Sequence, residues 1–117
     1  MRLLDARTLQ FKEINDLRII PKYAILSHTW TGKEVIYPDL ISSPQLAYQR
    51  PEFIKVKFTA QQALDDRLDY IWVDTCNIDK SSSAELSETI NSMFMLYKIA
   101  EVCYVYLTDV TKLPPAR

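Results

Sequence analysis

Residues 68–106 constrain the fold of this chain more than any other stretch. A β-branched and aromatic run at residues 70–73 is followed by the polar residues 74–80, by a long segment with helical periodicity, and by a second apolar run at residues 102–106. This pattern predicts a strand, a helix and a strand, which form a βαβ unit. Because such units are nearly always right-handed with parallel strands, the carboxyl ends of both strands should open on one edge of the sheet.

The helix in this unit has a recognisable start. Ser82 followed by Glu85 fits the capping box, in which the Glu85 side chain would bond back to the backbone of Ser82. This bond would explain the presence of Glu85 by helix capping alone, without any functional role. The apolar residues that follow at spacings of three and four predict a single packed face, made of Leu86, Ile90, Met93, Tyr97 and Ala100.

The first part of the chain adds further strands. Residues 1–14 are consistent with a short hairpin at a sheet edge, and residues 23–26 have the length of a buried strand. We therefore predict the α/β class, with a mostly parallel central sheet flanked by helices and an N-terminal edge hairpin. Residues 1–112 would form one domain, and residues 113–117, with two prolines, a C-terminal linker or tail.

Residues 31–50 are predicted to be mostly loop, whereas residues 51–64 are predicted to form a helix. The first stretch contains a glycine, prolines and paired serines, and it predicts a loop with a short strand at residues 35–37. In the second, Pro51 stands where the first turn of a helix tolerates proline. An amphipathic helix is expected there, with one apolar side and one polar side, made respectively of Phe53, Val56, Ala60, Ala63 and Leu64, and of Lys55, Lys57, Gln61 and Gln62.

Charge and composition argue against several classes of protein. Lys plus Arg number 14 and Asp plus Glu number 15, so no basic excess exists to hold a nucleic-acid backbone. No apolar run approaches the roughly 20 residues that span a bilayer, and the N-terminus lacks the apolar core of a signal peptide, so no membrane role and a cytoplasmic location are expected. The single glycine, Gly32, excludes the glycine-rich phosphate loops, which need several.

Polar side chains follow the predicted strands at the point where each strand ends. Strand by strand, they are Ser27, His28 and Trp30; Asp74, Cys76 and Asp79; and Thr108 and Asp109. Because the carboxyl ends of parallel strands meet at one edge of a sheet, we expect these side chains to converge on a ligand pocket.

The same residues have plainer structural explanations. His28 is the only histidine and no spaced pair of metal ligands exists, so no metal site is expected. Cys76 with His28 as its base would make a thiol hydrolase, but Cys76 is more simply a small residue in a tight turn. Asp74 would cap that turn. Cys76 and Cys103 lie in different contexts, which favours free thiols over a disulfide.

Three blocks of the sequence together resemble a known family. They are residues 23–30, residues 68–88 with Asp74-Thr75-Cys76-Asn77 and Glu85, and residues 90–107. In this order they closely resemble the fungal heterokaryon-incompatibility (HET) domain, over about residues 2–110. Two positions depart from the family pattern. Asn77 stands where the family commonly has a second cysteine, and Arg67 where it commonly has a glycine before the strand.

The resemblance implies a function in fungal cells. By this resemblance the chain would be a death effector of non-self recognition, attached to a larger fungal protein that often carries a nucleotide-binding receptor module. HET domains also resemble TIR domains, which have a flavodoxin-like fold. By this likeness NAD is a substrate, no resident cofactor is required, and Glu85 matches the glutamate that cleaves the nicotinamide–ribose bond. Glu88, one turn further along, is the reserve candidate. The implied ligand contacts are Ser27, His28, Trp30, Asp74, Cys76 and Asp79.

A second interpretation involves no chemistry. The domain would then be a non-enzymatic signalling module that acts by self-association, and Glu85 would only cap its helix.

Overall fold

The computed structural model describes residues 1–28, 33–106 and 115–116. The elements that position the site follow one another in the chain as β1 (Arg2–Asp5), β2 (Phe11–Glu13), η1 (Leu17–Ile19), β3 (Tyr23–His28), α1 (Tyr37–Ser42), α2 (Pro44–Gln49), η2 (Pro51–Phe53), α3 (Ile54–Asp65), β4 (Tyr70–Trp72), α4 (Asp74–Asn77), α5 (Ser83–Ile99), β5 (Val102–Tyr106) and β6 (Pro115–Ala116).

The strands form one six-stranded sheet in the order β2-β1-β4-β3-β5-β6. Strand β3 runs parallel to both β4 and β5, whereas the β1–β2, β1–β4 and β5–β6 pairs are antiparallel. The α/β class and the N-terminal edge hairpin are confirmed, but the prediction of a mostly parallel sheet is wrong. The hairpin belongs to the core because Leu3 and Leu4 are fully buried on opposite faces of the sheet.

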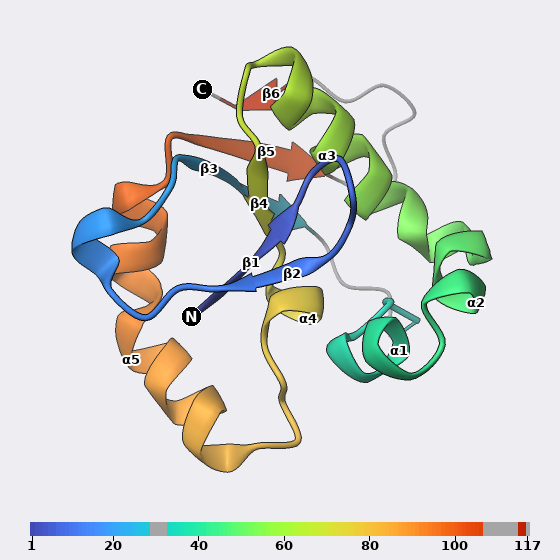
Figure 1. Cartoon of the computed structure of the whole chain (residues 1–117), viewed down its shortest axis with the longest axis horizontal. Helices are drawn as coiled ribbons and strands as arrows, with labels where there is room; N and C mark the ends of the chain where they lie inside the picture. The colour runs from blue at the N-terminus through green and yellow to red at the C-terminus, as the bar shows by residue number, and fades with distance from the viewer. Residues whose placement is uncertain (29–32, 107–114, 117) are drawn as a thin grey trace.

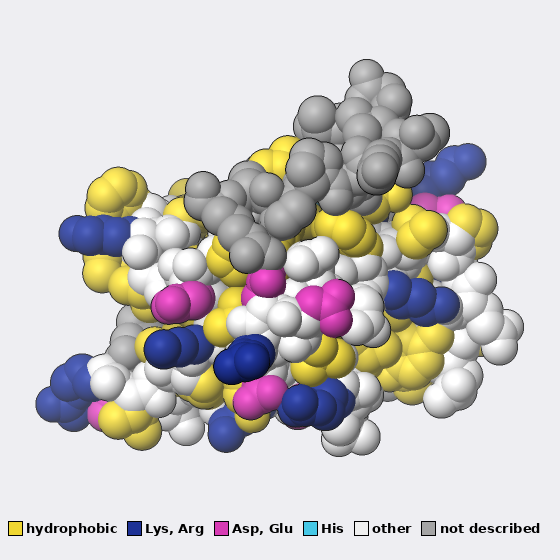
Figure 2. Space-filling view, turned by 90° about the horizontal axis from the view of Figure 1, so that it is seen from above, with side chains coloured by type: hydrophobic (Ala, Val, Ile, Leu, Met, Phe, Trp, Pro, Cys, Tyr) yellow, Lys and Arg dark blue, Asp and Glu magenta, His cyan; other side chains and the backbone are white. Residues whose placement is uncertain are grey.

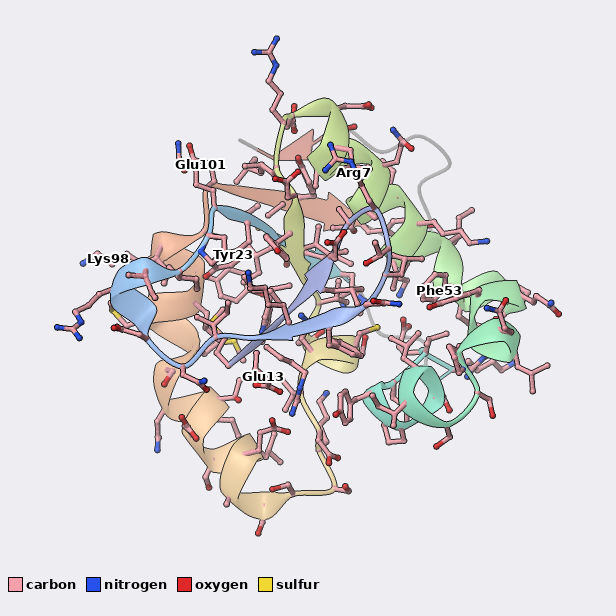
Figure 3. The ribbon with its side chains drawn as sticks, in the orientation of Figure 1. Arg7, Glu13, Tyr23, Phe53, Lys98 and Glu101 are labelled. Atoms are coloured by element: carbon pink, nitrogen blue, oxygen red, sulfur yellow. The ribbon has the colours of Figure 1, made fainter. Side chains whose placement is uncertain are left out.

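Helices cover the sheet on two faces. Helix α5 lies on one side, and α3 with α1 and α2 lies on the other (Figure 1). Figure 3 shows Tyr23 directed toward the α5 side and Phe53 on the α3 side. The Tyr23 hydroxyl donates a hydrogen bond of 2.5 Å to the carbonyl of Leu96 in α5, and burial raises the pKa of Tyr23 to about 12. A phenol so placed ties the helix to the central strand.

Helix α3 confirms the predicted amphipathic helix, with one correction. Phe53, Val56, Ala60 and Ala63 are buried as expected. Lys55 was placed on the polar side but is buried. It is held there by an acidic partner that local periodicity cannot reveal, Glu34.

Residues 33–50 correct the prediction of a loop with a short strand at 35–37. The described part of this stretch forms α1 and α2 instead. Pro38 and Pro44 stand in the first turns of these two helices, where proline lacks an N–H that would have no intrahelical partner anyway. The prolines that appeared to break structure therefore begin it.

Helix α5 is rotated from its predicted orientation. Leu96 is its buried residue, and Leu86, Met93 and Ala100 pack beside it. Ile90 and Tyr97, expected on the packed face, are exposed. Together with Phe94, Met95 and Ile99, Ile90 leaves exposed apolar side chains on α5, which we call the α5 outer face.

The turn between α3 and β4 contains Arg67, one of the two departures from the family pattern. Arg67 has φ 65°, in the left-handed region that favours glycine. Its N–H donates to the carbonyl of Leu64 and the next N–H, from Leu68, donates to that of Ala63, which closes the helix end. Arginine therefore adopts the turn that glycine would adopt more easily, at a cost of about 1–2 kcal/mol.

The ends of the chain and its surface complete the fold. Pro115 and Ala116 pair with β5, while residues 113, 114 and 117 lie outside the described part, so the division into a domain and a tail stays a prediction.

On the face in Figure 2, acidic and basic side chains are interspersed. No helix among the described residues is both long and apolar enough to span a membrane.

Candidate functional site

Two of the predicted polar strand endings meet. His28, the last residue of β3, places Nε2 2.9 Å from Oδ1 of Asp74, which follows β4. The convergence is therefore confirmed for these two residues. Ser27 faces the opposite side of the sheet, where its side chain bonds Tyr97 of α5; burial raises the pKa of Tyr97, and this bond opposes the rise.

A buried charged network surrounds His28. The Lys55 ammonium lies 3.2 Å from His28 Nδ1 and 2.8 Å from Glu34 Oε2, and the Lys55 and Glu34 side chains are only 6% and 8% exposed. An ammonium group has donors only, so His28 Nδ1 accepts and Nε2 donates to Asp74. Both ring nitrogens thus contact protein groups. The network joins the ends of β3 and β4 to α3.

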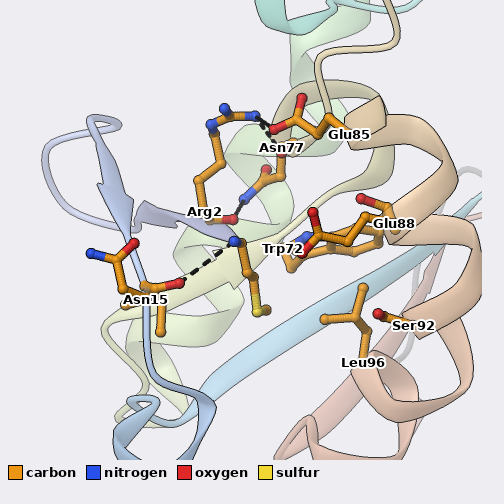
Figure 4. Close-up of a pocket in the computed structure, with 11 residues that line it drawn as sticks. Arg2, Asn15, Trp72, Asn77, Glu85, Glu88, Ser92 and Leu96 are labelled. Atoms are coloured by element: carbon orange, nitrogen blue, oxygen red, sulfur yellow. Dashed lines mark hydrogen bonds and ion pairs between the residues drawn. The ribbon is translucent and has the colours of Figure 1, made fainter. Parts of the chain in front are cut away.

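A separate cavity of about 250 Å³ opens beside the first turns of α5 (Figure 4). It lies between the N-terminal hairpin, the end of β4 and α5. Glu85 and the reserve candidate Glu88 both line it, but none of the other described residues of the predicted site does. The cavity is lined by Met1, Arg2, Ile14, Asn15, Trp72, Asn77, Glu85, Glu88, Thr89, Ser92 and Leu96.

Glu85 is held in this cavity by contacts that differ from the predicted capping box. Ser82 Oγ accepts a hydrogen bond from the Glu85 N–H at 3.3 Å, so half of the motif is confirmed. The prediction that the Glu85 side chain bonds back to the Ser82 backbone is wrong. Instead, Glu85 Oε2 accepts from the N–H of Asp79 at 2.6 Å, and Oε1 pairs with Arg2 Nη1 at 2.8 Å. Glu85 therefore bridges its own helix start to β1.

Of the lining residues, only Glu85 and Glu88 were predicted from the sequence, and three of the others shape the surroundings of Glu85. Arg2 supplies the cation beside Glu85, and Trp72 a ring wall. Asn77 donates from Nδ2 to the Arg2 carbonyl at 3.0 Å and accepts at Oδ1 from the Val73 N–H at 3.2 Å. Of these three residues, only Asn77 could have been singled out from the sequence, because it departs from the family pattern. Its side chain makes hydrogen bonds that hold the wall of the cavity.

The remaining predicted site residues lie elsewhere. Asp79 turns its carboxylate to the N–H and hydroxyl of Ser81, at 3.1 and 2.5 Å, and offers Glu85 its backbone instead. Cys76 is fully buried and donates from Sγ to the carbonyl of Val35 at 3.3 Å. Trp30 and the Thr108-Asp109 ending lie outside the described residues.

The environment of Cys76 opposes thiol chemistry. Burial is the main cause that raises the pKa of this thiol to about 12, and the nearby carboxylates add to it. A nucleophilic cysteine needs the opposite, a lowered pKa and access to solvent. Both cysteines are free thiols, and Cys103 is the less buried of the two.

We expect the two thiols to react at very different rates. At neutral pH, iodoacetamide should modify Cys103 first, and Cys76 only as fast as the fold opens, because the thiolate is the reacting form and Cys76 has neither charge nor access. Mass spectrometry of timed samples measures both rates. In Cys103→Ser, labelling should nearly vanish until denaturant is added; prompt labelling of Cys76 in that variant would contradict the prediction.

The fold and the cavity define a class: an α/β domain with three parallel strands and a carboxylate-bearing pocket between its N-terminal hairpin and α5. Residues 23–113 match the sequence profile of the family described as heterokaryon incompatibility protein (HET). The chain is 53% identical over 94 residues to vegetative incompatibility protein HET-E-1 of Podospora anserina. It therefore belongs to the HET family.

The match covers the two proteins unequally. It includes 79% of this chain but only 7% of the Podospora protein, so the chain spans a small part of the length of that curated relative. No solved structure gives a significant match to the chain.

Proposed function

We propose that this chain is an effector domain of fungal non-self recognition and programmed cell death, and that its Glu85 pocket binds and cleaves NAD. Membership of the HET family, together with the name of the Podospora relative, supports the role in incompatibility. In this proposal the domain acts in the cytoplasm within a longer protein that carries a nucleotide-binding receptor module. Its three parallel strands, with helices on both faces, would be a TIR-like core.

The observation that carries the enzymatic half is the placement of Glu85. Its carboxylate lines a real cavity beside an indole, Trp72, and a second carboxylate, Glu88. A volume of about 250 Å³ falls just below the roughly 300–1,000 Å³ of pockets that enclose whole ligands. The cavity therefore suits one half of a dinucleotide, the nicotinamide ribose, with the rest extending outside.

The chemistry follows from where charge develops. When the nicotinamide–ribose bond breaks, its electron pair moves onto the positively charged ring nitrogen, and neutral nicotinamide leaves. The ribosyl carbon that remains resembles an oxocarbenium ion, which a fixed carboxylate such as Glu85 stabilises. Water then adds to that carbon and releases a proton, which gives ADP-ribose.

The direct test is nicotinamide release. The purified chain is incubated with NAD in dilute buffer and under crowding, and nicotinamide is measured by chromatography. Release that depends on Glu85 and persists in Cys76→Ala supports the proposal. If no nicotinamide appears at any protein concentration, the enzymatic half fails and the role in incompatibility has to be exercised in another way.

A second candidate function rests on the α5 outer face. Phe94 is 75% exposed, and Ile90, Met95 and Ile99 are exposed apolar residues of the same helix. Figure 3 shows Lys98 pointing away from the sheet on this side of α5. We propose that a second copy of the chain covers this face, because a two-fold contact pairs a surface with itself and a net charge of -1 causes little repulsion between copies.

Self-association should then depend on Phe94. Phe94→Glu is expected to shift the chain from concentration-dependent dimers to monomers, because it places a charge in the centre of the apolar contact. Sedimentation equilibrium over a range of concentrations measures the shift. Ile54→Glu, an exposed apolar position on the α3 side, is the matched control. A chain that is monomeric throughout, or that dimerises equally in both variants, would rule out this contact.

A further inference from the structure

Arg2 connects several parts of the fold at the wall of the Glu85 pocket. Its Nη1 donates to Glu85 Oε1 at 2.8 Å and to the carbonyl of Asn77 at 3.1 Å, and its Nε donates to Glu13 Oε1 at 3.1 Å. The ring of Tyr37 lies 4.2 Å from its Cζ. With a side chain only 12% exposed, this guanidinium is held in place before any ligand arrives.

The two anchors on Glu85 come from different segments and fix different oxygens. Arg2 holds Oε1, and the N–H of Asp79 holds Oε2 at 2.6 Å. The carboxylate cannot turn about its last bond without losing both contacts. Since a carboxylate has about four acceptor positions, these two bonds leave others for a ligand in the pocket.

The strand that carries Arg2 is itself tied to the pocket. Asn77 Nδ2 donates to the Arg2 carbonyl at 3.0 Å and to that of Ile71 in β4 at 3.3 Å. The backbone on either side of the pocket is thereby held together. Arg2 lies before residue 23, where the match to the family profile begins, so that match assigns it no role.

We infer that Arg2 is a positioning residue for Glu85, which makes β1 part of the working pocket. Arg2 acts through Glu85: it holds the carboxylate where the ribosyl cation would form. Displacement of a reacting group by about 1 Å can lower a rate by about 100-fold. This catalytic consequence rests on the proposed function, whereas the positioning of Glu85 can be measured without any substrate.

The first measurement is amide hydrogen exchange of Asp79, followed by NMR in the intact chain. In Arg2→Gln, exchange at Asp79 should accelerate on the order of tenfold to 100-fold, because its acceptor Glu85 is no longer held. Arg2→Lys should fall between, since an ammonium keeps the charge but not the fork of donors. Arg7→Gln is the matched control, because Arg7 sits on the same hairpin and pairs with Asp69 at the surface.

The pattern across the chain separates positioning from general destabilisation. Positioning predicts faster exchange at Asp79 with β3 amides unchanged, whereas a merely structural role would accelerate exchange at both. Unaltered exchange at Asp79 in Arg2→Gln would overturn the inference, and so would equal acceleration throughout.

Nicotinamide release with NAD is the second measurement. We expect kcat to fall about 100-fold in Arg2→Gln with KM little changed, partial recovery in Arg2→Lys, and no change in Arg7→Gln. If the unsubstituted chain releases no nicotinamide, the proposed function fails, but exchange at Asp79 still decides whether Arg2 positions Glu85. If the unsubstituted chain is active and Arg2→Gln keeps full kcat, the inference fails while the proposed function stands.

Discussion

Glu85→Gln is expected to lower nicotinamide release from NAD by about 100-fold to 1,000-fold. The amide keeps the size of the side chain but removes the negative charge that would face the ribosyl cation, and loss of one preorganised electrostatic group typically costs this much. It also breaks the ion pair with Arg2. Initial rates measured over a range of NAD concentrations should show the loss in kcat.

Two further glutamates make this result interpretable. Glu88→Gln removes the other carboxylate of the cavity and should have a smaller effect, because Glu88 is exposed and makes no ion pair with another described residue. Glu101→Gln, at an exposed position beyond the end of α5, should have none. If Glu88→Gln abolishes release while Glu85→Gln does not, the catalytic role passes to Glu88. Matching thermal denaturation curves would show that each variant is folded.

Lys55→Ala is expected to destabilise the fold by about 3–5 kcal/mol. The ammonium contacts Glu34 and His28 inside the protein, and its removal leaves the Glu34 carboxylate buried without this partner. The loss of the four-carbon stem adds to the cost. Urea denaturation followed by circular dichroism gives the change in the free energy of unfolding.

The control for this prediction lies two residues away on the same helix. Lys57 is exposed, so Lys57→Ala should change stability by no more than about 0.5 kcal/mol. Lys55→Met, which keeps the length of the side chain without its charge, should recover only part of the loss. A cost below about 1 kcal/mol for Lys55→Ala would mean that solvent or another group satisfies Glu34, and that the network is not a structural support.

The candidate site was only partly predictable from local pattern. The abrupt polar endings placed His28 and Asp74 at one edge of the sheet, and they do meet. The pattern could not show that Glu85 lines a cavity that His28 and Asp74 do not reach. Long-range contacts decide on which face of the sheet a helix packs, and therefore where its side chains lie. The rotation of α5 shows the same limit, since apolar spacing alone did not distinguish Leu96, which is buried, from Ile90, which is exposed.

The sequence alone determined the strand–helix–strand unit, the edge hairpin and the Ser82 cap, which follow from periodicity and from interactions between residues close together in the chain. It also determined the family, through the match of whole sequence blocks to known members. Only the tertiary structure decided that the sheet is mixed, that Lys55 is buried, and that Arg2 holds Glu85. Each of these depends on partners far apart in the sequence, where burial stabilises a charge only if an opposite charge arrives from another segment.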